Sequence, residues 1–392
     1  MDQFSDTPRP IRLGLIGTGL AVEKLHWPVL SRTPRRYSVV AFADRSREQA
    51  ERFSSYSGIG MEAYHADYQD LLGREDVEAV LICLPIALLY TACRESLEAG
   101  KDVVCEKPVG RDEAEGRAFL ELPARFPERT VLIGENFFYR DAARLARWLL
   151  DEGAVGRLHL MAWRAVSRNV PRPGQFSSTP WRQHPEYRGG AHLDAGVHDV
   201  AEIRLCCGDV ASLHGLTQGA NSTIDGAPAD LILNLQFVSG AIGSYTAAYP
   251  DIAVPREPRE MRLYGTEGTM IVSGGREHRR VTVQRGDEVE VHSLKGVDDG
   301  YLGELCNFYD AVIHGDPVVG TIGQSFENQL IVQRALDSAE SGHVVPVGGG
   351  DASGQAGVPL WRPRGAEGLF DGLPGTHSIE RADARSLGLA TR

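Results

Sequence analysis

An aspartate and a histidine four residues apart are the first side chains in this sequence that could transfer protons. Asp194 and His198 lie in the glycine-flanked stretch 189–199, and a helix there would place both on one face. A carboxylate can fix the tautomer and orientation of an imidazole, and histidine exchanges protons near neutral pH. Such a pair suits removal of a hydroxyl proton while hydride leaves the same carbon.

Two other interpretations of this stretch remain open. His192, Asp194 and His198 are residue types that bind zinc, but no cysteine or fourth ligand is evident, and we predict no metal. The stretch could also be a helix cap followed by a buried histidine.

A lysine follows the apolar run 102–105, in Cys105-Glu106-Lys107-Pro108. The carboxyl ends of parallel strands face the ligand crevice of such a sheet. A lysine at that position can hydrogen-bond a reacting oxygen and relay its proton. The alternative is a lysine and a proline that end a strand at the surface.

A glycine turn, Gly17-Thr18-Gly19, lies between the first apolar run and the first amphipathic segment. The first glycine permits a tight turn, and the second lets a pyrophosphate approach the backbone at a helix N-terminus. The third glycine of the usual G-x-G-x-x-G pattern is replaced by Val22. That position governs helix–strand packing more than phosphate contact.

Asp44 ends the second apolar run, where its carboxylate can accept both hydroxyls of an adenosine ribose. This favours NAD, because a 2′-phosphate would meet a negative charge. Arg45 and Arg47 follow at once and could instead receive that phosphate, so NADP remains possible. The alternative is a glycine turn and a surface aspartate in an unrelated α/β protein.

The elements that must position these residues change character along the chain. The first third alternates continuous apolar runs with amphipathic segments, which predicts a doubly wound parallel sheet. Later segments alternate strictly, as in Leu231, Leu233, Leu235 and Phe237, which predicts a large, mostly antiparallel open sheet. The expected strands are 11–17, 37–44, 79–84, 102–105, 130–134, 231–237, 241–249, 260–264, 269–273, 280–284 and 343–347. The expected helices are 21–31, 47–56, 67–73, 88–99, 111–126, 144–152, 302–314 and 323–341.

The fold class is therefore α/β, with a Rossmann domain followed by an α+β domain. We place a dinucleotide-binding domain at 1–135, a substrate-binding and oligomerisation domain at 136–347, and an extended arm or disordered tail at 348–392. The tail is rich in glycine, proline and charge. Its apolar residues Leu360, Trp361, Leu369 and Phe370 favour an arm packed on this or a neighbouring subunit.

Composition limits the classes of function. The 392 residues carry a net charge of −12, which argues against broad nucleic-acid binding. We find no signal peptide and no apolar stretch of membrane-spanning length. The six cysteines form no CxxC pair and are expected to be reduced, so we predict a cytoplasmic protein.

Taken together, these motifs resemble the Gfo/Idh/MocA family of glucose–fructose oxidoreductases and inositol dehydrogenases. The resemblance covers roughly residues 11–347. Ala99-Gly100-Lys101-Asp102-Val103-Val104-Cys105-Glu106-Lys107-Pro108 is similar to that family's signature, and Gly134-Glu135-Asn136-Phe137 and Gly265-Thr266-Glu267-Gly268-Thr269 match it too.

The resemblance implies roles for the residues singled out above. Lys107, His198 and Asp194 are the predicted catalytic residues; in the family the lysine contacts the reacting hydroxyl, the histidine is the acid/base and the aspartate binds substrate. Trp181 and Arg182 are candidate substrate contacts, although Arg182 could equally be a surface arginine. The predicted cofactor-binding residues are Gly17, Thr18, Gly19, Leu20, Asp44, Arg45, Leu84, Pro85, Glu106, Lys107 and Asn136.

Two departures separate this chain from the family pattern. The family's P-N-x-x-H after the fourth strand is Pro85-Ile86-Ala87-Leu88-Leu89 here, which predicts a more apolar cofactor slot or weaker binding. The last aspartate of the motif around His198 is Ala201. Both put the transfer of a substrate from any one relative in doubt.

We therefore predict an NAD(P)-dependent dehydrogenase or reductase that acts on a sugar, cyclitol or related polyol, in a homodimer or homotetramer. Two alternatives remain: a non-catalytic dinucleotide-binding regulator, and an NAD-dependent glycosidase on the same fold.

Overall fold

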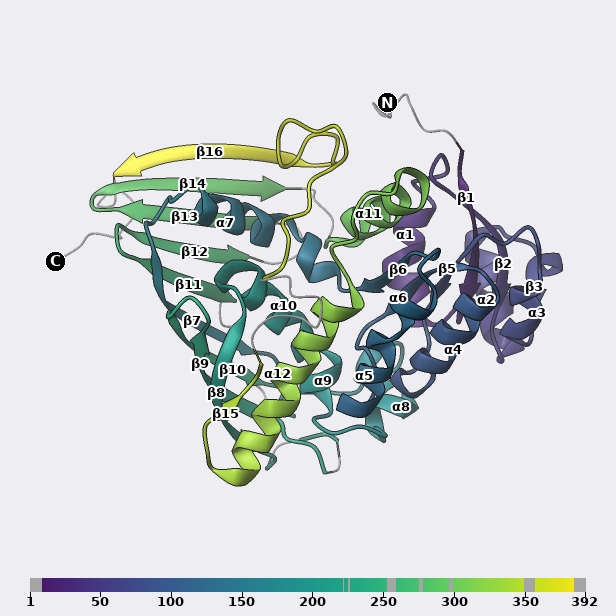
Figure 1. Ribbon diagram of the computed structural model, residues 1–392, viewed down its shortest axis with the longest axis horizontal. Helices are drawn as coiled ribbons and strands as arrows, with labels where there is room; N and C mark the ends of the chain where they lie inside the picture. The colour runs from purple at the N-terminus through teal and green to yellow at the C-terminus, as the bar shows by residue number, and fades with distance from the viewer. Residues whose placement is uncertain are drawn as a thin grey trace. The chain divides into compact units, whose positions relative to one another are not determined.

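Two compact units make up the chain in the computed structural model (Figure 1). The structure describes residues 9–220, 222–224, 226–251, 259–274, 278–295, 299–348 and 357–383. The first unit runs to Glu135 and adds Pro173–Phe176 and Tyr301–Phe326. The second contains Asn136–Arg172, Ser177–Gly300 and the chain from Glu327.

The first unit is built on a six-stranded parallel sheet in the order β3-β2-β1-β4-β5-β6. Its central strands are apolar throughout; all four residues of β4 are buried. Helices on both faces explain such runs. The strands are β1 Ile11–Ile16, β2 Tyr37–Ala43, β3 Tyr64–His65, β4 Ala79–Ile82, β5 Asp102–Glu106 and β6 Val131–Gly134. The helices are α1 Trp27–Leu30, α2 Arg47–Ser57, α3 Tyr68–Leu72, α4 Ile86–Glu98, α5 Glu113–Leu120, α6 Leu122–Arg125 and α11 Tyr301–His314.

Two helices of this unit differ from the sequence prediction. The expected helix over 111–126 is two helices, because Pro123 lies in the first turn of α6 and lacks the N–H that would continue α5. The expected helix over 21–31 contains a π-helical turn, Val22–His26, before α1. Neither change alters the parallel order predicted for the sheet.

The second unit contains a ten-stranded sheet in the order β15-β8-β9-β10-β7-β11-β12-β13-β14-β16. Only the β10–β7 pair is parallel, so the prediction of a large, mostly antiparallel sheet is confirmed. The strands are β7 Leu158–Val166, β8 Val210–Gln218, β9 Asp230–Phe237, β10 Ile242–Ala248, β11 Glu260–Gly265, β12 Thr269–Gly274, β13 His278–Arg285, β14 Glu288–Lys295, β15 Val345–Pro346 and β16 Thr376–Asp383.

Burial along β9 follows the predicted alternation. Leu231, Leu233, Leu235 and Phe237 are buried, whereas Ile232 on the other face is 44% exposed. The sequence prediction missed β3, β7, β8, β14 and β16, because these segments carry polar residues or lack a clean period of two.

Helices cover one face of this sheet (Figure 1). α7 packs on β12 and β13, and α10 packs on α7. This arrangement places the start of α10, which carries His198, beside the chain segment that leads into α7. The helices are α7 Asp141–Asp151, α8 Pro180–Gln183, α9 Ala191–Asp194 and α10 Gly196–Cys207; α12 Ile322–Ser341 begins in the first unit and ends in the second.

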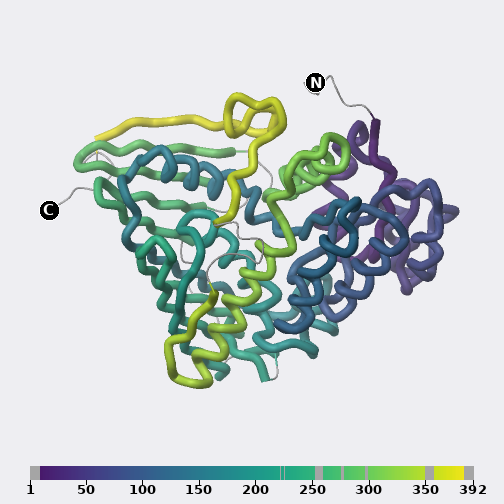
Figure 2. The backbone as a smooth tube through the Cα atoms, viewed as in Figure 1, coloured from purple at the N-terminus to yellow at the C-terminus, as the bar shows by residue number. Residues whose placement is uncertain are grey.

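The C-terminal segment 357–383 packs on its own second unit. Figure 2 shows it, in yellow, passing α7 and ending as β16 along β14 at the edge of the sheet. Trp361 is 4% exposed, and its carbonyl accepts a hydrogen bond from Arg144 Nε at 3.0 Å. The carbonyl of Leu369 accepts one from Arg144 Nη2 at 2.7 Å. One buried guanidinium on α7 therefore fastens this segment. Residues 349–356 and 384–392 of the predicted tail lie outside the described residues.

Replacing Arg144 by methionine is expected to lower the free energy of unfolding by about 3–5 kcal/mol. The Arg144 side chain is fully buried. Its loss leaves two carbonyl oxygens without their hydrogen-bond donor and removes the ion pair with the Asp141 carboxylate, which lies 3.3 Å from Arg144 Nη1. Urea unfolding measures this loss. Arg117→Met is the control, because Arg117 is 62% exposed and its i,i+4 pair with Glu113 contributes about 0.5 kcal/mol or less. Equal losses in both variants would show that Arg144 does not fasten the segment.

Two further observations concern the chain as a whole. None of the helices that the structure describes is long and apolar enough to cross a membrane. All six cysteines are free thiols.

Candidate active site

The glycine turn that follows β1 is built so that glycine is required at its first position. Gly17 has a φ of +86°, and a Cβ added there would lie 2.5 Å from the carbonyl oxygen of Cys83. Nothing lies within 4 Å of a Cβ added at Gly19, so its backbone is open to close approach. Helical residues begin at Leu20. Val22, at the position of the absent third glycine, is completely buried against the sheet.

Asp44 is tied to this turn. Its Oδ2 accepts hydrogen bonds from Thr18 N at 2.9 Å and from Thr18 Oγ1 at 3.1 Å, and its Oδ1 accepts one from Ser46 N at 2.9 Å. A carboxylate has about four acceptor positions and three are used here, so Asp44 retains one for a ribose hydroxyl. Arg45, which follows it, is exposed.

The ends of β4 and β5 bring the remaining predicted residues of this unit to the same sheet edge. Leu84 and Pro85 follow β4 and are half-buried, and Leu84 lies against the turn at Gly17. Glu106 ends β5, and the half-buried Lys107 follows it with a cis bond to Pro108. The structure thus gathers Gly17–Leu20, Asp44, Leu84, Pro85, Glu106 and Lys107 along the carboxyl edge.

Ile86 and Leu89, which replace polar residues of the family pattern, do not line a more apolar cofactor slot as the sequence suggested. Both side chains face the core of the first unit from α4, with exposures of 1% and 0%. They therefore stabilise the packing of α4 and do not form an apolar surface for a ligand.

His198 lies at the start of α10 in the second unit and is half-buried. Its imidazole stacks on the ring of Phe137, with centroids 4.6 Å apart and planes 18° apart. The Arg140 guanidinium lies 4.3 Å from the centroid of the same Phe137 ring. Phe137 fixes the plane of the imidazole. This role of Phe137 could not be predicted from the sequence, because nothing local to Phe137 indicates a partner 61 positions further along the chain.

Asp194 is separated from α10 by a break in the helix at Ala195. Its carboxylate pairs with Arg182, at 2.6 Å from Nε and 3.3 Å from Nη2. The Arg182 guanidinium in turn lies 3.9 Å from the ring centroid of Trp181. Arg182 is only 17% exposed and is therefore not a simple surface arginine. Three of the predicted substrate and catalytic residues thus form one cluster in the second unit.

Two tyrosines adjoin this cluster. Burial, with the nearby Asp194 carboxylate, raises the pKa of Tyr187 and of Tyr249 well above that of a free phenol. Both hydroxyls therefore stay protonated at neutral pH and can donate hydrogen bonds.

His192 is a core residue. It is 1% exposed, burial lowers its pKa to about 4, and its ring lies 5.1 Å from that of Tyr249. Among the described residues, the one group of three convergent candidate ligands is His26, Cys83 and Glu106 in the first unit. In the part of the chain that the structure describes, His192, Asp194 and His198 do not form such a group.

Asn136 begins the second unit and is 1% exposed. Its Nδ2 donates to the carbonyl oxygen of Asp299 at 2.5 Å, whereas its Oδ1 has no hydrogen-bond partner among the described residues. A cofactor contact by Asn136 stays a prediction.

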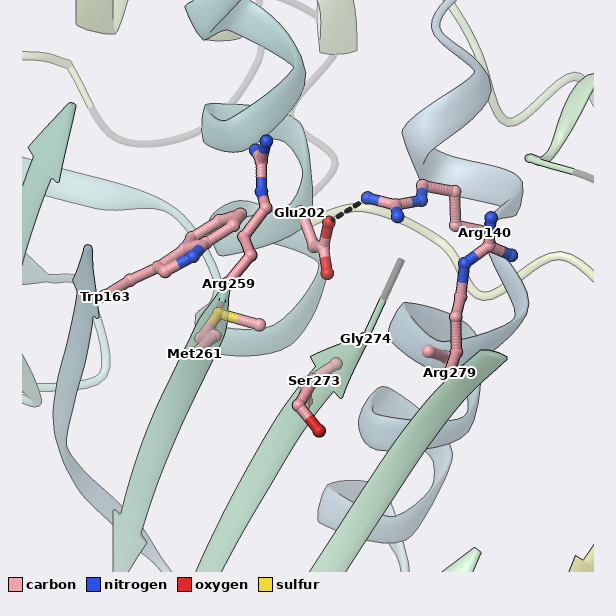
Figure 3. Close-up of a pocket in the computed structure, with 10 residues that line it drawn as sticks. Arg140, Trp163, Glu202, Arg259, Met261, Ser273, Gly274 and Arg279 are labelled. Carbon is pink, nitrogen blue, oxygen red and sulfur yellow. Dashed lines mark hydrogen bonds and ion pairs between the residues drawn. The ribbon is translucent and has the colours of Figure 1, made fainter. Parts of the chain in front are cut away.

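A pocket in the second unit is lined by three arginines and Glu202 (Figure 3). Glu202, one helical turn after His198, accepts from Arg140 Nη1 at 2.8 Å. Because each guanidinium meets a carboxylate, the pocket is electrically balanced and supports α10 without requiring an anion. The ion pairs are Arg140–Glu202, Arg140–Asp299, Arg279–Asp299 and Arg259–Asp199.

The residues of the first unit fit a dinucleotide. The open backbone at Gly19 precedes a helix N-terminus, where N–H groups favour a pyrophosphate. Asp44 stands where a ribose would meet it, and Lys107 stands at the end of a central strand. The second unit contains the His198 imidazole, which stacks on Phe137, and the ion pair of Asp194 and Arg182, whose polar atoms can bind hydroxyl groups.

Comparison with known proteins identifies the class. Family models match residues 11–131 as an oxidoreductase-family NAD-binding Rossmann fold and residues 143–271 as a GFO/IDH/MocA C-terminal domain. A dTDP-3,4-didehydro-2,6-dideoxy-alpha-D-glucose 3-reductase from Streptomyces violaceoruber is 30% identical over 325 residues, which cover 79% of this chain and 87% of the relative. The chain belongs to the Gfo/Idh/MocA oxidoreductase family, as the sequence predicted.

One further relative and one solved structure agree with this family assignment. A 1,5-anhydro-D-fructose reductase from Ensifer adhaerens is 28% identical, over 78% of this chain and 90% of the relative. The crystal structure of an oxidoreductase from Thermotoga maritima superposes with a TM-score of 0.77 at 28% identity, covering 86% of this chain and 99% of that one. The protein is accordingly an NAD-binding oxidoreductase.

Proposed function

We propose that this protein interconverts a secondary alcohol and a ketone on a sugar, cyclitol or related polyol, with NAD as the preferred cofactor. The two relatives named above, a deoxysugar reductase and an anhydrosugar reductase, act on rings of this kind. The observation that carries the proposal is the His198 imidazole, which is half-buried and stacked on Phe137 in a unit that also contains the Asp194–Arg182 pair.

Each residue has a distinct task in this proposal. His198 takes the hydroxyl proton during oxidation and returns it during reduction. Lys107 donates a hydrogen bond to the reacting oxygen and stabilises its negative charge. Asp194, held by Arg182, accepts a hydrogen bond from a neighbouring hydroxyl. The nicotinamide of bound NAD supplies the hydride chemistry.

The preference for NAD rests on Asp44. Replacing Asp44 by alanine is expected to weaken NADH binding about 10- to 100-fold, because hydrogen bonds to a carboxylate contribute about 1.5–3 kcal/mol each. The same change removes the negative charge that a 2′-phosphate would meet, so the discrimination against NADPH should fall. Titrations of both cofactors by intrinsic fluorescence measure these affinities.

The control for Asp44 is Asp102→Ala. Asp102 also accepts a backbone hydrogen bond, from Thr130 N at 2.7 Å, but begins β5 at the amino edge of the sheet, opposite the edge that carries Asp44. Its loss should leave NADH affinity unchanged. An unchanged NADH affinity in the Asp44 variant would refute the assigned ribose contact.

A substrate panel tests the reaction itself. Ketoses, anhydroketoses and inosose ketones are mixed with NADH, and loss of absorbance at the NADH band reports reduction. Turnover of at least one ring ketone is expected. Tight NADH binding with no turnover would instead indicate a regulator, and release of free sugar from a glycoside without net NADH would indicate a glycosidase.

We also propose that the exposed face of the ten-stranded sheet joins copies of the chain into a homodimer or homotetramer. Leu216, Ile232 and Ile242 on β8, β9 and β10 are 44–55% exposed. Light scattering after size-exclusion chromatography measures the mass in solution, and a strictly monomeric particle would contradict this proposal.

A further inference from the structure

His26 is a fully buried histidine that the reaction proposed above does not use. It ends the π-helical turn Val22–His26, a few residues after the glycine turn. π-helical turns occur preferentially at functional sites, because the extra residue redirects side chains. Here the redirected imidazole points into the first unit, with a side-chain exposure of 0%.

The contacts of His26 lead to Lys107. His26 Nε2 lies 2.7 Å from Glu106 Oε1, and Glu106 Oε2 accepts a hydrogen bond from the backbone N–H of Lys107 at 3.2 Å. The edge of the Tyr301 ring packs on the imidazole, with centroids 5.3 Å apart. Nδ1 has no hydrogen-bond partner among the described residues. Because a carboxylate only accepts, Nε2 is the donor.

The Glu106 carboxylate is therefore held at both oxygens. One oxygen is fixed by the helix that follows β1, and the other by the peptide of Lys107 itself. A carboxylate with one free oxygen could rotate about its last two torsions, and the peptide of Lys107 would lose its orienting partner. Burial, with the nearby carboxylates of Glu106 and Glu304, raises the pKa of Cys83, so this neighbouring thiol stays protonated and neutral.

A bound zinc ion is the rival explanation of the same atoms. His26, Cys83 and Glu106 present ligand atoms within 4.8 Å of one another, and all three residue types bind zinc. Two ligands held at 2.0–2.1 Å from a tetrahedral zinc would lie roughly 3.3 Å apart. The observed 2.7 Å between Nε2 and Oε1 is the distance of a direct hydrogen bond. The geometry therefore favours the hydrogen bond.

We propose that His26 is a positioning residue that orients Lys107 through Glu106. This inference rests on the proposed function, in which Lys107 contacts the reacting oxygen. His26 touches neither substrate nor reacting atoms, so its effect should appear in turnover and not in cofactor affinity.

The test compares His26→Leu with His26→Gln in the full chain. Leucine removes the donor, and kcat is expected to fall about 10- to 100-fold with NADH affinity within threefold of wild type. The glutamine amide can donate to Glu106 and should restore kcat to within about fivefold. Ser96→Ala is the matched control, because it removes a buried hydrogen bond to the Ala92 carbonyl within α4 and should leave kcat unchanged.

A second readout is independent of turnover. The sequence contains four lysines, Lys24, Lys101, Lys107 and Lys295, so the acetylation rate of each can be followed by mass spectrometry. His26→Leu should change the rate at Lys107 severalfold and leave Lys24 and Lys295 unaltered. If the wild type reduces no ketone, the proposed function fails and this labelling still decides the role of His26.

Three results would overturn the inference. One is a His26→Leu enzyme with kcat within twofold of wild type or with unchanged labelling at Lys107. Another is a glutamine variant as impaired as the leucine variant. The third is stoichiometric zinc binding by the wild-type protein, measured by calorimetry with zinc chloride and lost in Cys83→Ser, which would assign these residues to a metal.

Discussion

The His198→Asn enzyme is expected to bind NADH normally and to turn over its ring substrate about 100- to 10,000-fold more slowly than wild type. Asparagine keeps a polar side chain of similar size but cannot take up and return a proton at neutral pH. The contacts assigned to the pyrophosphate and ribose belong to Gly17–Leu20 and Asp44 of the first unit, and the substitution leaves them intact. Steady-state kinetics with a fluorescence titration separate the two effects.

Chemical rescue makes this test specific. In His198→Ala the space beside the Phe137 ring is vacated, and added imidazole should restore part of the lost kcat by stacking there. His159→Asn is the control, since His159 is an exposed histidine of the same unit on β7. A His198→Asn enzyme with more than a tenth of wild-type kcat would remove His198 from its role as acid/base.

Lys107→Met is expected to lower kcat about 100- to 1,000-fold, the range seen when one donor to a developing oxyanion is removed. Methionine has a similar unbranched length but offers no donor and no charge. The kcat of Lys107→Arg should lie between those of the wild type and Lys107→Met, because the guanidinium retains the charge but does not release its proton. The expected loss lies mainly in kcat, since the stabilised charge develops only in the transition state.

The control for this lysine is Lys295→Met, which removes an exposed lysine at the end of β14. It should leave kcat and KM unchanged. A Lys107→Met enzyme with normal kcat and a raised KM would contradict the assignment, because uniform binding of substrate and transition state gives that pattern.

Much of the fold follows from local sequence patterns. Continuous apolar runs such as β4 predict a sheet covered on both faces, and the alternation in β9 predicts a sheet with one open face. The glycine turn, Asp44 and the Glu106-Lys107-Pro108 run could be assigned because each depends on position relative to a strand. Each of these features depends on residues that are close together in the chain, so the sequence alone is enough to predict it.

The components of the site that the sequence did not reveal depend on contacts between distant segments. Asp194 and His198 are separated by a helix break at Ala195, and Asp194 pairs with Arg182. A spacing of four residues predicts a shared face only in a continuous helix. The stacking of Phe137 on His198 joins residues that no periodicity relates.

His26 and the C-terminal segment show the same division between local and tertiary information. A histidine in an amphipathic helix is equally consistent with a surface and with a buried hydrogen bond, and only the packing of β5 beside it selects Glu106 as its partner. Likewise, the polar strand β16 has little apolar pattern of its own and forms because β14 offers an unpaired edge. The two sheets, the glycine turn and the residue types of the candidate site therefore follow from local patterns in the sequence. The pairing of charges and rings follows only from the folded chain, because a buried ion pair or ring contact joins side chains that are far apart until the chain folds.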